Sequence, residues 1–203
     1  MIDINNIQNC NWKSKCISII GAGKSGIAAA RLGKHIGSKI FISDISENNK
    51  IGKYFCKDEY EMGIHSDKIK MSDFIVLSPG IPRHINIIKE CIDEGILIVS
   101  EIEFASWFTT SPILALTGSN GKTTTINLLQ DMCVRHGKTS LLGGNVGTPF
   151  SENVLWEINS KSKSVIHVLE ISSFQLEYIY NFSPDISCLL NLSPDHMDRY
   201  DSF

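Results

Sequence analysis

The chain has 203 residues, 42% of them hydrophobic and 20% charged, which is enough to bury a core in one large or two small domains. Its net charge of −3 excludes a basic field for nucleic acid or an anionic membrane, and no apolar run is long enough to span a bilayer. The polar amino terminus is not a secretory signal, and the six cysteines lack Cys-x-x-Cys or metal-finger spacing, so we expect a cytoplasmic protein with reduced thiols, mostly in the core.

The first predicted strand, at residues 16–20, runs into a turn with Gly-x-Gly-x-x-Gly spacing at residues 21–26, and then into a helix that Gly37 ends. The next strand ends at Asp44. A strand–helix–strand opening with this turn and an acidic residue about 20 positions on is typical of a dinucleotide site. Because such a turn binds a pyrophosphate, UDP fits it as well as NAD does, and these residues alone leave the nucleotide open.

A buried strand at residues 73–78 ends in a turn at residues 78–82, Ser-Pro-Gly-Ile-Pro, through which neither helix nor sheet continues. The turn is either a connector or a ligand loop, since open α/β sheets bind ligands at the carboxyl ends of parallel strands. A helix, a strand and a short helix follow, at residues 85–94, 96–99 and 101–108.

Residues 109–112, Thr-Thr-Ser-Pro, interrupt the apolar pattern and indicate a linker. We therefore predict two domains, residues 1–109 and residues 110–203. Strands and helices alternate in both parts, so the predicted fold class is α/β, with two doubly wound units in series.

The second part opens with an apolar strand at residues 113–116, the turn at residues 117–124 (Thr-Gly-Ser-Asn-Gly-Lys-Thr-Thr) and a helix. Together they form a phosphate-binding loop, whose amides and helix dipole attract an anion. Lys122 supplies a charge for the outer phosphates, and the Thr123 hydroxyl is placed to ligate Mg²⁺. The loop is a shortened Gly-x-x-Gly-Lys-Thr variant, because Leu116 stands where the usual first glycine would be. The alternative, a polar turn with a chance Gly-Lys-Thr, is disfavoured by the flanking strand and helix.

Two later strands of this part also end in polar residues. The strand at residues 164–169 leads to Glu170, which either holds Mg²⁺ or caps the next helix. The strand at residues 186–190 precedes Asp195 and His196, and its place at a carboxyl edge makes His196 either a ligand or an ordinary structural residue.

These motifs, in this order, resemble those of the Mur ligases, a family of ATP-dependent amino-acid ligases of peptidoglycan synthesis. The segments that carry the resemblance are the phosphate loop and residues 144–147, 169–177 and 191–199. The turn at residues 78–82 and the run at residues 172–177 point to the branch that adds D-glutamate to UDP-N-acetylmuramoyl-L-alanine. The resemblance covers almost the whole chain and implies a Rossmann-like UDP-binding domain followed by the first part of a P-loop ATPase domain.

The resemblance also implies site residues and a reaction. ATP would be bound by Gly118, Ser119, Asn120, Gly121, Lys122, Thr123 and Thr124; Mg²⁺ by Thr123, Glu170 and His196; and the UDP-sugar by Gly23, Lys24, Ser25, Asp44, Ser78, Pro79, Gly80, Asn145 and Ser172. The catalytic set would be Lys122, Glu170 and His196. The γ-phosphoryl of ATP would pass to the alanyl carboxylate, and the D-glutamate amine would then displace phosphate to form an amide. Because carboxylate and triphosphate repel each other, the lysine and Mg²⁺ must neutralise charge.

Members of this family are much longer than 203 residues. We therefore expect a fragment that does not complete ligation alone and whose uncovered apolar sheet surface promotes association, whereas the full-length protein would be a monomer. Two other functions stay open: an NAD-dependent oxidoreductase, which leaves the Lys122 loop unexplained, and a non-catalytic nucleotide-binding remnant.

Overall fold

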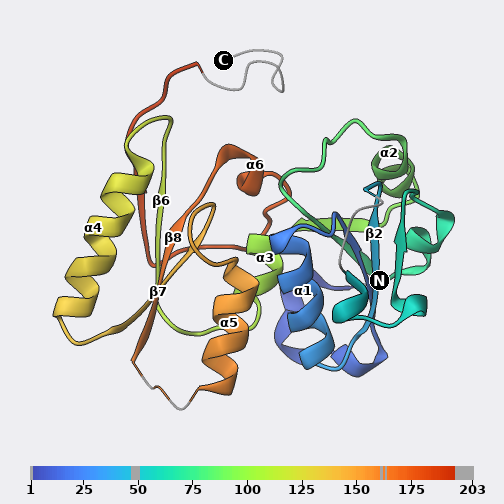
Figure 1. Ribbon diagram of the computed structural model, residues 1–203, viewed down its shortest axis with the longest axis horizontal. Coiled ribbons are helices and arrows are strands. Elements are labelled where there is room, and N and C mark those ends of the chain that lie inside the picture. The colour runs from blue at the N-terminus through green and yellow to red at the C-terminus, as the bar shows by residue number, and fades with distance from the viewer. Residues whose placement is uncertain (1, 47–50, 161, 163, 195–203) are drawn as a thin grey trace.

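The computed structural model describes residues 2–46, 51–160, 162 and 164–194 of the chain. Its strands and helices alternate and form two parallel sheets that lie side by side (Figure 1). The strands are β1 Cys16–Ile20, β2 Lys39–Asp44, β3 Tyr60–Met62, β4 Phe74–Leu77, β5 Leu97–Ser100, β6 Ile113–Thr117, β7 Thr139–Gly144, β8 Val165–Glu170 and β9 Ile186–Leu189. The α-helices are α1 Lys24–His35, α2 Asn86–Asp93, α3 Glu101–Ser106, α4 Lys122–Arg135, α5 Phe150–Asn159 and α6 Ser173–Leu176. Short 3₁₀ turns lie at Ile4–Asn9, Trp12–Ser14, Ile51–Lys53, Lys57–Glu59 and Asp67–Met71.

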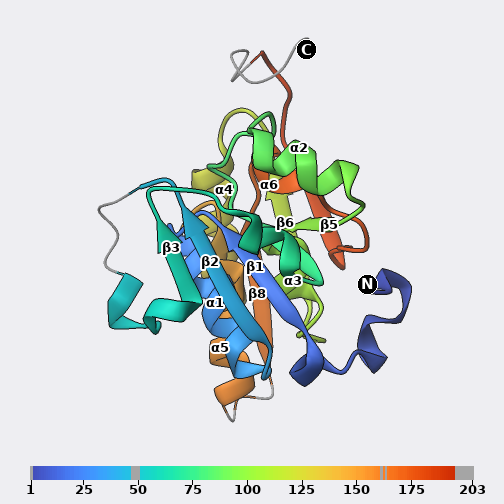
Figure 2. The ribbon, with the colours of Figure 1, turned by 90° about the vertical axis from the view of Figure 1, so that its right-hand side faces the viewer.

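The first sheet has the strand order β3-β2-β1-β4-β5, all parallel, and Figure 2 shows β3, β2 and β1 side by side. Strand β4 is buried along its whole length, as expected for a parallel strand covered on both faces. The chain runs from β1 to β2 on one side and returns to β4 on the other. The carboxyl ends of β1 and β4 therefore flank the crevice where open α/β sheets bind ligands.

The second sheet has the order β7-β8-β6-β9, again all parallel. Strand β8 pairs directly with β6, with Leu116 opposite Glu170, so the carboxylate of Glu170 lies beside the start of the phosphate loop. Strand β9 forms the edge, and its Ile186 and Leu189 side chains are 63% and 57% exposed. An apolar sheet edge is thus uncovered in the described part of the chain, and the association expected from it remains a prediction.

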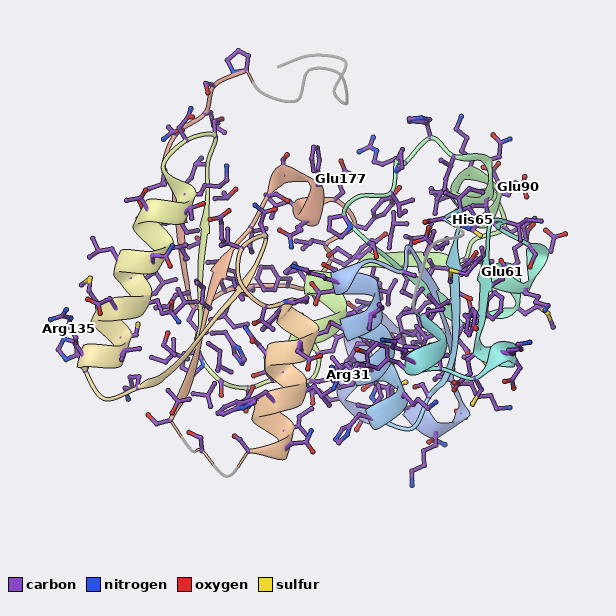
Figure 3. The ribbon with its side chains drawn as sticks, in the orientation of Figure 1. Arg31, Glu61, His65, Glu90, Arg135 and Glu177 are labelled. Carbon is purple, nitrogen blue, oxygen red and sulfur yellow. The ribbon has the colours of Figure 1, made fainter. Side chains whose placement is uncertain are left out.

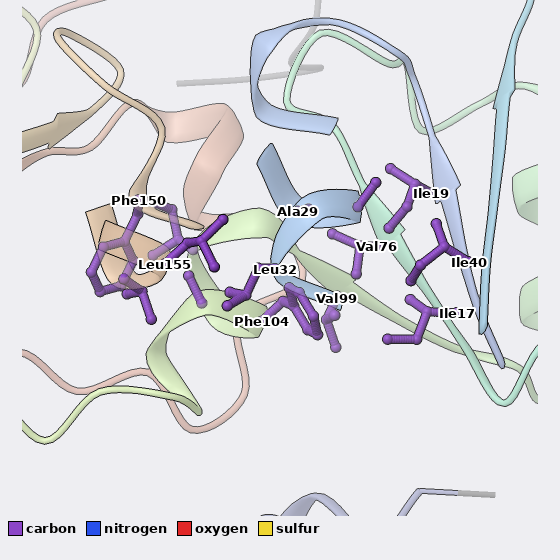
Figure 4. Packing of buried hydrophobic residues seen from close by; sticks show 14 of the residues in the cluster. Ile17, Ile19, Ala29, Leu32, Ile40, Val76, Val99, Phe104, Phe150 and Leu155 are labelled. Carbon is purple, nitrogen blue, oxygen red and sulfur yellow. The ribbon is translucent and has the colours of Figure 1, made fainter. Parts of the chain in front are cut away.

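One apolar cluster extends across both sheets. Helix α5 of the second half packs against α1 and α3 of the first. Phe150 and Leu155 of α5 belong to the same cluster as Leu32 and Phe104 (Figure 4). At the surface of this contact, Arg31 Nη1 donates to both carboxylate oxygens of Glu152, at 2.8 and 2.7 Å. The two halves therefore share one core, which fixes their relative position.

Helix α3 carries a buried glutamate that anchors a segment of the second half. The carboxylate of Glu103 accepts hydrogen bonds from the amides of Tyr180, Asn181 and Phe182, at 2.8 to 3.1 Å. It also accepts from the indole Nε1 of Trp107 at 2.8 Å. Burial of this carboxylate is tolerated because both of its oxygens accept hydrogen bonds.

A second acidic side chain of α3, Glu101, is 1% exposed and joins the two halves by one strong contact. Its Oε1 accepts the amide of Ser151, in the first turn of α5, at 2.5 Å. Its Oε2 has no hydrogen-bond partner among the described residues. Burial raises the pKa of Glu101 to about 7, although the hydrogen bond from the Ser151 amide favours the ionised form.

The cysteines depart in part from the expected core placement. Cys91 is buried, whereas Cys56 and Cys188 are exposed. Cys188 lies on the edge strand β9, which nothing covers in the described part of the chain, so its exposure follows from the strand order.

Candidate functional site

The glycine turn after β1 is built by approaches too close for side chains. Gly21 has φ of +96°, and its carbonyl oxygen accepts a hydrogen bond from Ser78 Oγ at 2.9 Å. A Cβ at position 26 would lie 1.8 Å from that oxygen. Helix α1 can approach the turn this closely only because Gly26 has no side chain. Gly23, the N-cap of α1, is exposed, and no atom lies within 4 Å of the place where its Cβ would be. The turn presents an open helix N-terminus, the geometry that binds a pyrophosphate.

Asp44 contributes to the shape of this turn. Its Oδ2 accepts the amide of Ala22 at 2.6 Å and its Oδ1 that of Ser46 at 2.8 Å. The carboxylate therefore ties the glycine turn to the end of β2, a function that sequence reasoning did not assign to it. The remaining predicted residues of this half, Lys24, Ser25, Ser78, Pro79 and Gly80, lie in the first turn of α1 or just after β4, at the same edge of the sheet.

The phosphate loop connects β6 to α4, and its two glycines adopt left-handed conformations, with φ of +147° at Gly118 and +81° at Gly121. The first hydrogen bond of α4 runs from the Thr125 amide to the Gly121 carbonyl, at 3.1 Å. The amides of the preceding residues in that turn are the unpaired donors of a helix N-terminus. Lys122 Nζ folds back and donates to the carbonyls of Gly118 and Ser119, at 2.5 and 3.0 Å. Positive charge and helix dipole thus meet at one loop.

Glu170 brings the phosphate loop and the loop after β7 together. The side chain is 1% exposed, and its Oε2 accepts from Thr123 Oγ1 at 3.0 Å. Its Oε1 accepts from Asn145 Nδ2 at 2.8 Å, and its backbone carbonyl accepts the Asn145 amide at 2.7 Å. A Cβ at Gly144, where φ is +93°, would lie 2.2 Å from that carbonyl oxygen, so this contact requires glycine. Three predicted site residues therefore form one hydrogen-bonded group.

The donor set fits Mg²⁺. Thr123 and Glu170 supply the hydroxyl and carboxylate oxygens that Mg²⁺ prefers, and this ion normally takes one or two protein ligands together with phosphates and water. No group of three or more His, Cys, Asp or Glu side chains that would hold a metal occurs among the described residues. Two protein oxygens suit an ion whose remaining ligands are phosphate oxygens and water. His196, the third predicted ligand, lies outside the described residues.

Helix α6, whose N-cap is Ser172, lies between the two sheets (Figure 1). The Oγ of Ser172 accepts the amide of Gln175 at 3.4 Å, while Gln175 Oε1 accepts the Ser172 amide at 3.0 Å, so the pair forms a capping box. A small pocket beside it is lined by residues of both halves, among them Ser78, Glu101 and Gln175. The turn after β4, the start of α3 and helix α6 thus border a common space.

Sequence reasoning missed the contact between the phosphate loop and the segment that follows β9. Asn191 and Ser193 of this segment form hydrogen bonds with Ser119 and Asn120. The available signal was the position of a polar residue at the carboxyl end of a strand next to the phosphate-loop strand. Figure 3 shows the side chains of both sheets in the orientation of Figure 1.

Comparisons with known proteins match both halves. Residues 16–87 match the family described as MurD N-terminal domain, and residues 116–203 match the Mur ligase middle domain. The UDP-N-acetylmuramoylalanine–D-glutamate ligase of Chlorobaculum tepidum is 40% identical over 195 residues, which are 93% of this chain and 41% of that protein. The protein of the same name from Christiangramia forsetii is 43% identical over 191 residues, 92% of this chain and 42% of its own length. The chain therefore spans about two fifths of the length of these relatives.

Solved structures with low sequence identity share the fold. A ligase described as UDP-N-acetylmuramate:L-alanyl-gamma-D-glutamyl-meso-diaminopimelate ligase, from Neisseria meningitides, has a TM-score of 0.53 at 20% identity, over 92% of this chain and 63% of that one. A murein peptide ligase from Psychrobacter arcticus has a TM-score of 0.52 at 18% identity, over 91% and 44%. Within the described residues, no helix is both long and apolar enough to cross a membrane.

Proposed function

Because the chain belongs to the Mur ligase family, with a MurD-type N-terminal domain and the middle domain, we propose that it binds ATP at the phosphate loop and a UDP-linked sugar at the glycine turn. The reaction served is the ATP-dependent joining of D-glutamate to UDP-N-acetylmuramoyl-L-alanine through an acyl phosphate. The observation that carries this proposal is the group of Thr123, Glu170 and Asn145 beside the Lys122 loop. On this proposal the two units meet near residue 109.

Each residue of this group has a definite task in the proposal. Lys122 leaves the carbonyls of its own loop and pairs with the outer phosphates, which are stronger acceptors because they are charged. Thr123 and Glu170 would hold Mg²⁺, which supplies charge neutralisation when bound. Asn145, whose side chain Glu170 already holds, would help to orient the UDP-sugar. Ser172, at the start of α6, would do the same. His196 is proposed as a further ligand from its motif alone.

Replacing Lys122 with alanine tests the phosphate loop. We expect the affinity for Mg²⁺-ATP to fall about 30-fold, because one charge-assisted hydrogen bond contributes about 2 kcal/mol. Lys138→Ala, at an exposed lysine beyond the other end of α4, is the matched control and should bind as the wild type does. Isothermal titration calorimetry measures the affinity of the wild type and the two variants for Mg²⁺-ATP. Equal affinity of Lys122→Ala and the wild type would exclude the loop as the ATP site.

Gly23→Asp tests the glycine turn. No atom lies within 4 Å of the place of a Cβ at position 23, so the fold should tolerate the substitution, and the new carboxylate would face the diphosphate of the ligand. Repulsion of about 2 kcal/mol predicts about 30-fold weaker binding of UDP-N-acetylmuramoyl-L-alanine. Gly23→Asn has the same shape without the charge and should bind within about threefold of the wild type. A parallel titration with NADH distinguishes this proposal from an NAD-dependent oxidoreductase. Binding of NADH but not of the UDP-sugar would indicate the oxidoreductase.

A further inference from the structure

The outer side of the phosphate loop is held by the segment after β9, which rises beside β6 to the top of α4 (Figure 1). Asn191 is the centre of this contact. Its Oδ1 accepts the Asn120 amide at 2.9 Å, and its Nδ2 donates to the Asn120 carbonyl at 2.9 Å. Its own carbonyl accepts the Ser119 amide at 3.0 Å. One residue therefore satisfies three backbone groups at the middle of the loop.

The contact continues on both sides of Asn191. The Leu190 amide donates to the Thr117 carbonyl at 3.0 Å. Ser119 Oγ donates to the Ser193 carbonyl at 3.0 Å and accepts the Ser193 amide at 2.9 Å. A Cβ at Gly118 would lie 3.1 Å from Leu190 Cβ and 3.2 Å from the Asn191 backbone. The segment thus lies directly against the loop, and a side chain at position 118 would push it away.

These bonds divide the amides of the loop into two sets. In a phosphate-binding loop, successive amides converge on the anion. Here the amides of Ser119 and Asn120 are already used by Asn191. The amides left for an anion include those of the first turn of α4, where no intrahelical partner exists. The shortened loop, with Leu116 in place of the usual first glycine, therefore depends on a neighbour to keep its shape.

We propose that Asn191 is a positioning residue of the nucleotide site: it holds the loop at Ser119 and Asn120 so that the first turn of α4 and Lys122 face the phosphates. Asn191 itself does not contact the nucleotide. The inference rests on the proposed binding of ATP at this loop. It predicts that the loop is ordered before the nucleotide arrives, which lowers the ordering entropy lost on binding.

Amide hydrogen exchange of the wild-type chain tests this division directly. Without nucleotide, the Ser119 and Asn120 amides should exchange slowly, and Mg²⁺-ATP should slow them little further. The amides of Lys122, Thr123 and Thr124 should exchange fast in the free protein and at least about tenfold more slowly in the complex. Fast exchange of Ser119 and Asn120 in the free protein, with protection gained on binding, would show that they face the anion and would overturn the proposal.

Variants supply the second measurement. Asn191→Ala should bind Mg²⁺-ATP and inorganic triphosphate each about tenfold more weakly, because the loss lies in the phosphate site. Asn191→Asp should bind more weakly still, since it loses the donor to Asn120 and adds a negative charge. Leu192→Ala is the control, because this neighbouring side chain of the same segment is 69% exposed, and its affinity should stay within about twofold of the wild type.

The outcomes separate this inference from the proposed function. If Lys122→Ala loses affinity while Asn191→Ala and Asn191→Asp keep the wild-type value, Asn191 has no positioning role and the ATP site stands. If the folded wild type binds neither Mg²⁺-ATP nor triphosphate, the proposed function fails, and the inference fails with it. If Asn191→Ala does not fold, the exchange pattern of the wild type decides.

Discussion

Glu103→Ala is expected to lower the free energy of unfolding by about 4 kcal/mol. The substitution removes the acceptor of three consecutive amides, those of Tyr180, Asn181 and Phe182, and of the Trp107 indole. Glu103 itself is fully buried, whereas its four donors are partly buried or exposed, so each donor loses a bond to a charged acceptor, at a cost of about 1 kcal/mol. Because the amides belong to the second half and Glu103 to the first, the substitution also loosens the contact between the halves. Urea unfolding followed by tryptophan fluorescence measures the change.

Two control variants separate the hydrogen bonds from the loss of charge or of side-chain volume. Glu103→Gln keeps one acceptor oxygen and should cost about half as much. Glu152→Ala removes a glutamate whose partner, Arg31, is 45% exposed, and should cost less than about 1 kcal/mol. An unfolding midpoint of Glu103→Ala within error of the wild type would contradict the anchoring role.

The contribution of Glu101 to stability should fall by about 3 kcal/mol as the pH rises from 4.5 to 8. Its pKa is about 7 in the folded chain, against 4.5 for a free glutamate. The folded state therefore holds the proton more tightly than the unfolded state. The contribution is fully present below about pH 4.5 and is lost as the pH rises through 7.

Glu101→Gln isolates this effect, because glutamine resembles the protonated acid at every pH. Its unfolding free energy should exceed that of the wild type by an amount that grows by about 3 kcal/mol between pH 4.5 and 8. Burial lowers the pKa of His65, which makes stability rise with pH near 6.5, but this contribution is the same in both proteins and cancels in the difference. Parallel pH profiles for the two proteins would show that Glu101 titrates normally.

Much of this architecture was predictable because local patterns and topology agree. The glycine turn after β1 and the Lys122 loop were each identified from spacing, and both occur where an apolar strand meets a helix. The proximity of Glu170 to the phosphate loop followed from the expected strand order and is confirmed by the pairing of β8 with β6. The resemblance to the Mur ligases is also confirmed, at the level of the family and its fold.

The parts of the fold and the site that were not predicted depend on contacts between residues far apart in the sequence, which no local pattern encodes. Acidic residues are rarely buried, so Glu101 and Glu103 gave no signal that one would contact α5 and the other three distant amides. Strand β3 has only three residues and is defined by its pairing with β2, so no strand was predicted there. The reciprocal bonds of Asn120 and Asn191 join positions 71 residues apart. The residue assignments of the two binding sites remain predictions until the titrations described above are made.

The core shared by α1, α3 and α5 has a consequence for reaction rate. The glycine turn and the phosphate loop each stand at the end of a sheet packed on this core, so their separation is set when the chain folds. On the proposed function, the substrate carboxylate and the γ-phosphate of ATP, bound at the two turns, would meet in an intramolecular event with a high effective concentration. The entropy of that alignment would then be lost when the chain folds, and the packing of Phe150 against the first half would contribute to the alignment without touching either ligand.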